Sequence, residues 1–115
     1  MSSKTFQYLS DINGEPTAHL SGLKKVFLAS QDTETALTQF AFGIFEPGEI
    51  CPRHRHPTME ELFYFMKGEG EYEIGNQIVD IKPGTFLRIP ANTDHQLVNS
   101  GNGTLEFVYF GIATE

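Results

Sequence analysis

Short, β-prone segments divided by turn residues are the feature that most narrows the fold of this 115-residue chain. Aromatic and β-branched residues gather in these segments, and Gly, Pro, Asn or Asp separates one segment from the next. The expected strands are residues 25–30, 35–45, 62–66, 71–74, 77–81, 85–89, 95–99 and 104–110. Many short strands at near-regular spacing predict an all-β sandwich or barrel.

Local patterns support this assignment. Phe40, Phe42 and Ile44 alternate with other residues, as side chains on one face of a strand do. Gly75-Asn76 lies between two expected strands, and both residues tolerate the left-handed backbone of a two-residue hairpin turn. No long helical period competes with the strand pattern, and residues 1–22 show the least regular pattern.

Length and charge restrict the partners of the chain. A chain of 115 residues fits one domain, and its hydrophobic share of 39% is enough for a packed core. The formal net charge of −7 opposes binding to nucleic-acid phosphate and to anionic membrane surfaces. The sequence also has no basic stripe with interleaved aromatic residues. We therefore expect a small-molecule ligand or substrate, and neither nucleic acid nor a membrane.

The cysteine content and the N-terminal residues bear on the compartment. Cys51 is the single cysteine, so no intrachain disulfide can form, which suits a reducing compartment. The N-terminal residues contain no long apolar run of the kind a signal peptide needs, and no apolar stretch reaches the length of a membrane span. We expect a cytoplasmic protein.

Three histidines and a glutamate carry the chemistry that the sequence indicates. His54 and His56 are two residues apart, so on a strand their imidazoles point to the same face. Glu61 can reach the same interior if the strand that follows pairs back against the first, and His95 comes from a distant strand. Three imidazoles and one carboxylate suit manganese, iron, cobalt, nickel, copper or zinc. Two nearby histidines on their own are more often a surface feature than a metal site. The spacing of all four residues therefore decides between these two interpretations.

That spacing resembles the two sequence motifs of the cupin superfamily. The first motif has gaps of five, one, four and six residues between Gly48, His54, His56, Glu61 and Gly68. The second has gaps of five, one, two and three residues between Gly84, Pro90, Asn92, His95 and Asn99. Asn92 stands where the family usually has Gly, and Asn is the residue that best replaces Gly in a left-handed turn.

The resemblance implies a fold and a metal site. The fold would be an all-β double-stranded β-helix, or jelly-roll barrel, forming a single domain over residues 1–115 with its motif-bearing core at 48–99. The metal ligands would be His54, His56, Glu61 and His95, holding one divalent transition metal ion (Fe, Mn, Ni, Cu, Co or Zn). Small members of the family commonly pair through their sheets, so a homodimer is expected.

Other residues are weaker candidates for the site. Phe63 and Phe65 share the parity of Glu61 and could line a cavity beside the metal, with core packing as their other role. Arg88 could grip an anionic ligand, although a solvated edge position is its alternative. Glu60 is the rival of Glu61 and is expected to face the opposite side.

Three further polar residues receive structural roles. We expect Cys51 to be a buried thiol and not a ligand, because a free cysteine behaves as a small apolar residue. We expect His19 to lie at the surface of the polar N-terminal region. Asn99 is expected to fix a turn or to support the metal ligands from outside.

A shell of three histidines and one glutamate would leave about two positions of an octahedral ion open to oxygen, water or an organic ligand. The first hypothesis is therefore a metal-dependent enzyme acting on a small oxygenated metabolite, with dioxygenase-like oxidoreductase chemistry. The second is a lyase or isomerase acting on a sugar-derived or carboxylated compound, with Tyr64, Tyr72 or Glu73 as conceivable bases. The third is a ligand-binding module without turnover. No catalytic residue follows from the sequence.

Overall fold

The computed structural model describes residues 4–19 and 21–115, and in that part of the chain the strands form two antiparallel sheets. The large sheet has the order β1 (Glu15–Pro16), β2 (Leu23–Ala29), β3 (Leu37–Phe45), β10 (Leu105–Ala113), β5 (Met59–Lys67) and β8 (Thr85–Ile89). The small sheet has the order β4 (Ile50–His54), β9 (His95–Val98), β6 (Gly70–Ile74) and β7 (Gln77–Ile81). Two short 3-10 turns, η1 (Leu9–Asp11) and η2 (Ser30–Asp32), lie before β3.

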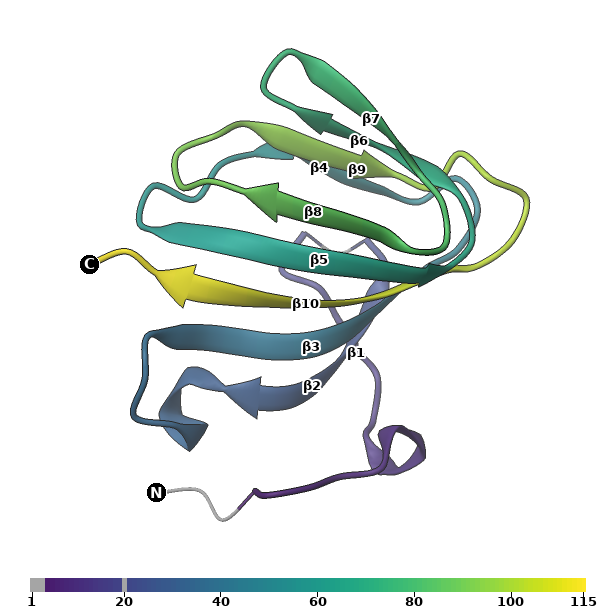
Figure 1. Ribbon diagram of the computed structural model, residues 1–115. Coiled ribbons are helices and arrows are strands. Elements are labelled where there is room, and N and C mark those ends of the chain that lie inside the picture. Colours follow the sequence, from purple (N-terminus) through teal and green to yellow (C-terminus); the bar gives the residue numbers. More distant parts are fainter. Residues whose placement is uncertain (1–3, 20) are drawn as a thin grey trace.

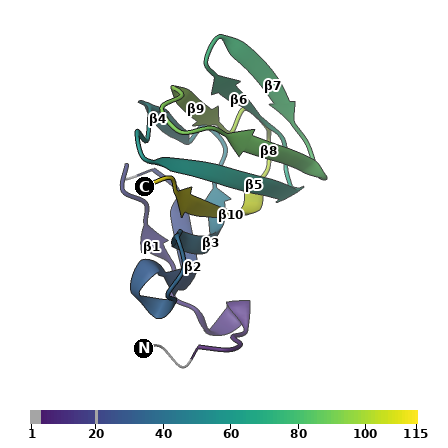
Figure 2. The same ribbon diagram turned by 60° about the vertical axis from the view of Figure 1, so that its left-hand side comes forward.

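The two sheets face one another, as Figures 1 and 2 show from two directions. Successive strands alternate between the sheets over much of the chain, which is the double-sheet arrangement of a jelly roll. The predicted fold class is confirmed. The sequence pattern did not predict a strand at β4, which contains Pro52 and Arg53. Because β4 is the edge strand of the small sheet, a proline there removes no ladder hydrogen bond that the sheet needs.

Two expected turns are present. β6 and β7 pair directly on either side of Gly75-Asn76, and Gly75 has a φ of 61°. Asn92 also has a φ of 61°, which makes it the one non-Gly residue with positive φ in the described part of the chain. The left-handed turn expected at Asn92 is confirmed, and its backbone N–H donates to the carbonyl oxygen of His56 at 2.7 Å.

The strand register of the large sheet separates an inner face from an outer face. One inward row runs across four strands through Ala41, Tyr109, Phe63 and Leu87. The next inward row runs through Gln39, Gly111, Glu61 and Ile89. Between the sheets, the inward residues pack into an aromatic core in which Phe65 is fully buried. This face of the large sheet therefore supplies both the core and the wall of the interior.

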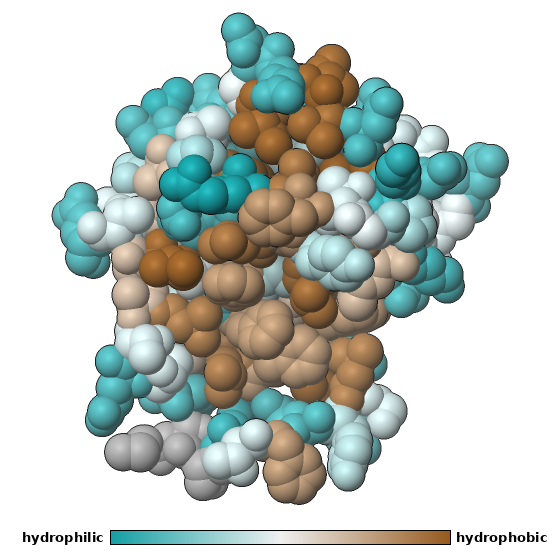
Figure 3. All heavy atoms as spheres, in the orientation of Figure 1, coloured by the Kyte–Doolittle hydropathy of each residue, from teal (hydrophilic) through white to brown (hydrophobic). Residues whose placement is uncertain are grey.

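The outer face of the large sheet is also apolar. One outward row runs through Phe42, Val108, Tyr64 and Phe86, and the neighbouring row contains Phe40, Phe110 and Leu62. Figure 3 shows hydrophobic residues gathering over the middle of the face that is turned toward the viewer. The alternation of Phe40, Phe42 and Ile44 thus marks this outer face, whereas the cavity side of β3 carries Gln39 and Ala41.

The described residues 4–19 and 21–115 include no helix with the length and apolar character needed to cross a membrane.

Candidate metal centre

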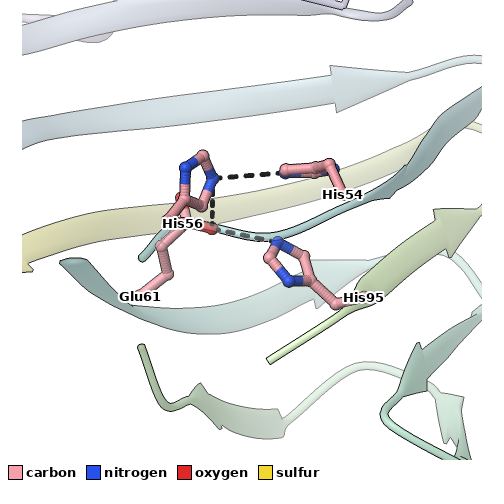
Figure 4. A group of neighbouring side chains, drawn as sticks. All are labelled: His54, His56, Glu61 and His95. Atoms are coloured by element: carbon pink, nitrogen blue, oxygen red, sulfur yellow. Dashed lines mark hydrogen bonds and ion pairs between the residues drawn. The ribbon is translucent and has the colours of Figure 1, made fainter. Parts of the chain in front are cut away.

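Three side chains from residues 54–61 and one from residue 95 converge between the sheets (Figure 4). The Nε2 atom of His54 lies 3.2 Å from Nε2 of His56. Oε1 of Glu61 lies 3.5 Å from Nε2 of His56 and 3.4 Å from Nε2 of His95. The candidate ligand atoms of the four residues all lie within 4.8 Å of one another. The structure therefore brings together the four residues that the motifs single out.

The route by which Glu61 reaches the site differs from the expected one. β4 pairs with β9, whereas β5 pairs with β10 and β8, so the strand after His56 does not pair back against β4. Glu61 instead approaches from the large sheet, opposite the histidines. His56 also lies beyond the end of β4, so strand alternation does not set its direction. Facing sheets, and not a shared hairpin, create the convergence.

Main-chain carbonyl groups orient two of the imidazoles. Nδ1 of His54 donates to the carbonyl oxygen of Pro52 at 2.7 Å, and Nδ1 of His95 donates to that of Thr93 at 2.8 Å. A carbonyl oxygen can only accept, so the proton of each neutral ring is on Nδ1 and the lone pair is on Nε2. Both lone pairs then face the centre of the group, as in imidazoles that bind a metal.

The donor set fits a cation. His95 is 1% exposed, and its Nε2 has no hydrogen-bond partner within the described residues. A buried polar atom without a partner is rare and costly in folded proteins. Nε2 of His56 lies 3.2 Å from the Nε2 lone pair of His54, so a proton or a cation must lie between these two atoms. A divalent ion bound by His54, His56, Glu61 and His95 would satisfy all of these atoms.

Electrostatics keep two of the imidazoles neutral. Burial lowers the pKa of His54 below its usual value, and the nearby His95 lowers it further, against the raising effect of the Pro52 carbonyl. Burial also lowers the pKa of His56, although the charge of Glu61 partly offsets this effect. Because only the neutral imidazole can donate its lone pair, these shifts favour metal binding near neutral pH.

Polar contacts join the two loops that carry the histidines. The Arg55 guanidinium donates to Asp94 at 2.7 Å and to the side-chain oxygen of Asn92 at 3.2 Å. The hydrogen bond from Arg55 lowers the pKa of the Asp94 carboxyl below its usual range. Together with the bond from Asn92 N–H to the His56 carbonyl, these contacts fix the His56 loop against the segment that leads into His95.

A cavity of about 250 Å³ is lined by three of the four residues, His54, His56 and Glu61, whereas His95 does not line it. Its walls also include several aromatic side chains, Phe63 among them. Phe65 packs in the core instead and is not among the lining residues. Arg88 is exposed on the outer face, where it pairs with Glu60 at 3.0 Å. Of the three residues offered as cavity lining, the structure therefore places only Phe63 in the wall.

The cavity also brings in residues to which the sequence assigned other roles. His19 is exposed but lines the cavity, and its ring centroid lies 4.2 Å from that of His54. His19, Cys51 and His54 form a second group whose ligand atoms lie within 4.8 Å of one another. Burial raises the pKa of the Cys51 thiol to about 11, so this sulfur stays protonated at neutral pH. The position of His19 carries no motif that could have revealed it.

The conceivable bases differ in their placement. Tyr72 lines the cavity, and its complete burial raises the pKa of its hydroxyl well above the usual value. Tyr64 is exposed on the outer face. Glu73 accepts a hydrogen bond from Gln96 at 3.2 Å and does not line the cavity. Asn99 is buried and bonds to the carbonyl oxygens of Phe45 and Gly103, which is the turn-fixing role expected of it.

Comparisons with known proteins agree with this geometry. Over 68 residues, 59% of this chain, the sequence is 34% identical to an uncharacterised protein of Methanocaldococcus jannaschii. Over 69 residues, 60% of this chain, it is 32% identical to an oxalate-binding protein of Thermotoga maritima. The matched stretches cover 54% and 57% of those proteins, so the chain spans about half the length of the curated relatives it matches.

A solved structure and a family profile cover more of the chain. The crystal structure of a predicted oxalate decarboxylase from Thermotoga maritima superimposes with a TM-score of 0.87 at 24% identity, covering 95% of this chain and 99% of that one. This likeness concerns the fold. The profile of the cupin domain matches residues 41–111, which include the four candidate ligands. The chain therefore belongs to the cupin family.

Proposed function

We propose that this cupin holds one divalent transition metal ion on His54, His56, Glu61 and His95 and acts there on a small oxygenated metabolite. The observation that carries the proposal is the buried Nε2 of His95, which has no hydrogen-bond partner among the described residues and lies 3.4 Å from Glu61, a residue of the cavity wall. When bound, the ion would supply Lewis-acid and redox chemistry. The aromatic walls would exclude water and so strengthen electrostatic interactions at the site.

The leading reaction class is a dioxygenase-like oxidation. A lyase or isomerase needs a side-chain base that reaches the substrate. Burial keeps the cavity hydroxyls of Tyr72 and Tyr109 and the thiol of Cys51 protonated, so these three groups are poor bases. Chemistry that depends on the metal and an external oxidant, dioxygen, makes smaller demands on the surrounding side chains. The cavity composition therefore favours the oxidoreductase.

Two observations support other candidate functions. His19 lines the cavity next to His54 and is the imidazole there that is not one of the four candidate ligands, so it supports a lyase or isomerase in which it moves the proton. The similarity to an oxalate-binding protein supports a module that binds a small carboxylate on its metal without turnover.

Elemental analysis of the protein and three variants tests the metal proposal. We expect near-stoichiometric metal in the wild type, loss in His54→Ala and Glu61→Gln, and retention in His19→Ala. His54 belongs to both candidate groups, whereas Glu61 and His19 each belong to one. Retention in Glu61→Gln with loss in His19→Ala would assign the metal to the second group instead.

Turnover assays separate the three functions. The protein loaded with iron, manganese or nickel is incubated with a panel of small carboxylic and enolic compounds, and oxygen uptake and products are measured. Product with oxygen uptake supports the oxidoreductase. Product without oxygen moves the assignment to a lyase or isomerase. Tight binding of a compound that is then recovered unchanged supports the binding module.

We also propose a homodimer that forms through the outer face of the large sheet. Tyr64 and Phe86 support it, since they are cross-strand partners on this face and are 48% and 61% exposed. Exposed apolar patches of this kind mark interaction sites. Sedimentation should give twice the 12.9 kDa mass of the chain, and Tyr64→Lys should give the monomer. A wild type that sediments at 12.9 kDa would remove the idea.

A further inference from the structure

The cavity wall contains a polar group on the large sheet, away from the histidines. Lys24, Gln39 and Tyr109 come from three strands, β2, β3 and β10, and all three side chains line the cavity. Nζ of Lys24 donates to Oε1 of Gln39 at 2.8 Å. Gln39 and Tyr109 are diagonal neighbours on the inward face of β3 and β10. We call Lys24, Gln39 and Tyr109 the anchor group.

The direction of these bonds leaves donors free for a ligand. Because Oε1 of Gln39 accepts from Lys24, the NH2 group of Gln39 remains a donor, and the Tyr109 hydroxyl has its own proton to donate. Burial is the main cause that raises the pKa of Tyr109, so the hydroxyl remains a donor. Lys24 has three N–H bonds and forms no ion pair with any residue in 4–19 or 21–115.

Register places the anchor group across the cavity floor from the candidate metal ligands. Gln39, Gly111 and Glu61 are cross-strand partners on β3, β10 and β5. Two strand spacings therefore separate the backbones of Gln39 and Glu61, which is about 10 Å. The side chains of Thr38 and Met59 pack over Gly111. Beside them, one continuous cavity wall includes the anchor group, the rings of Phe63 and Phe107, and Glu61. A small molecule can thus touch both polar ends and place its carbon atoms against the rings.

The net charge of the metal-loaded site favours an anionic ligand. With a divalent ion bound, the positive charges of the ion and of Lys24 exceed the negative charges of Glu61 and of Glu15, the cross-strand partner of Lys24. We infer that Lys24, Gln39 and Tyr109 bind the distal carboxylate of a dicarboxylic acid whose other end is an oxygen ligand of the metal. Hydrogen bonds from a charged donor to a carboxylate are short and strong, which suits a specificity contact. This inference rests on the proposed function and names its substrate class.

Calorimetry on the metal-loaded protein tests the inference with matched acids. 2-Oxoglutarate and 2-oxopentanoate differ only in the distal carboxylate, as do malate and 2-hydroxybutanoate. We expect the wild type to bind each diacid at least about tenfold more tightly than its monoacid partner. Lys24→Met should remove most of that preference and leave the metal content and the monoacid affinities unchanged. Gln39→Leu and Tyr109→Phe should reduce the preference in part.

Lys25→Met is the matched control, because Lys25 donates to the carbonyl oxygen of Leu9 and does not line the cavity. It should keep the full preference for diacids. Equal affinity of the wild type for diacid and monoacid, or a preference that survives Lys24→Met, would overturn the inference and leave the metal proposal standing. A wild type that holds metal but binds none of the four acids would overturn both the inference and the proposed substrate class.

Discussion

The two ends of the cavity are built in different ways. At the metal end, three imidazoles come from β4, the loop after it and β9, and main-chain carbonyls orient two of them. At the other end, the anchor group joins side chains of three strands, and a hydrogen bond from Lys24 to Gln39 links two of them. The metal end therefore depends on local turns, whereas the anchor end depends on the register of the large sheet. Substitutions should separate binding of the metal from selection of the ligand.

The largest expected effect is at the metal end. His56→Ala removes a candidate ligand atom that lies 3.5 Å from Glu61, so stoichiometric metal binding should be lost. Glu60→Ala is the control, since Glu60 pairs with Arg88 on the outer face. Metal titration followed by elemental analysis makes the comparison. Metal that persists at full occupancy in His56→Ala would show that His56 is not needed.

Acidic pH should weaken metal binding at the metal end of the cavity. The pKa values of His54 and His56 lie below 6.5 in the folded protein, so protons compete with the metal only on the acid side of that value. Below it, the apparent metal affinity should fall by up to about tenfold per pH unit for each competing proton. Competition titrations with a chelator between pH 8 and 5 measure this. An affinity that stays flat over the range would contradict a histidine-rich shell.

The metal-free protein should also lose stability in acid. Where the folded pKa of a histidine is depressed, the unfolded chain binds more protons once the pH drops below 6.5. The free energy of unfolding should therefore decrease as the pH falls through 6.5 and level off below the folded pKa values. Urea unfolding at several pH values checks the sign. A gain in stability over this window would contradict the lowered pKa values.

A smaller effect is expected from the contacts around the metal end. Arg55→Ala breaks the bonds to Asp94 and Asn92 and leaves the four candidate ligands in place. Loss of such outer contacts typically weakens metal binding by about tenfold or more. Arg88→Ala removes a comparable exposed ion pair on the outer face of the large sheet, away from the side where Glu61 points, and should leave the affinity unchanged. Equal affinities in both variants would mean that the Arg55 contacts do not position the histidines.

The smallest effect is expected at the anchor end. Tyr109→Phe removes one hydroxyl donor and keeps the ring, so diacid binding should weaken by roughly fivefold, the usual worth of one hydrogen bond. Metal affinity should not change. Tyr64→Phe, on the exposed outer face, is the control. A parallel loss of metal and diacid affinity in Tyr109→Phe would mean that the two ends do not act separately.

The same comparison explains what could be predicted from the sequence. His54, His56, Glu61 and His95 were predictable because glycines, a proline and Asn92 mark fixed turns between them. The hairpin at Gly75-Asn76 was predictable for the same reason. The pairing considered between β4 and the strand carrying Glu61 does not form, because alternation within strands does not tell which sheet a strand joins.

The anchor group left no mark on the sequence. Lys24, Gln39 and Tyr109 are far apart in the chain, and only the register of β2, β3 and β10 puts them in one wall. Arg88 was a plausible binding residue for an anion by its type. It is, however, the cross-strand partner of Leu62, and both side chains face outward. His19 reaches the cavity through a segment without regular strand pattern. A residue's type indicates its chemistry, but its face depends on long-range pairing.

The position of Glu61 on the sheet opposite the histidines has a thermodynamic consequence. An ion bound to all four residues would cross-link the two sheets, and the unfolded chain would not keep those atoms together. Metal binding and barrel closure are then linked equilibria, in which free ion at 100 times its dissociation constant would add about 2.7 kcal/mol to the stability. The melting temperature of this cupin would consequently report the availability of its metal.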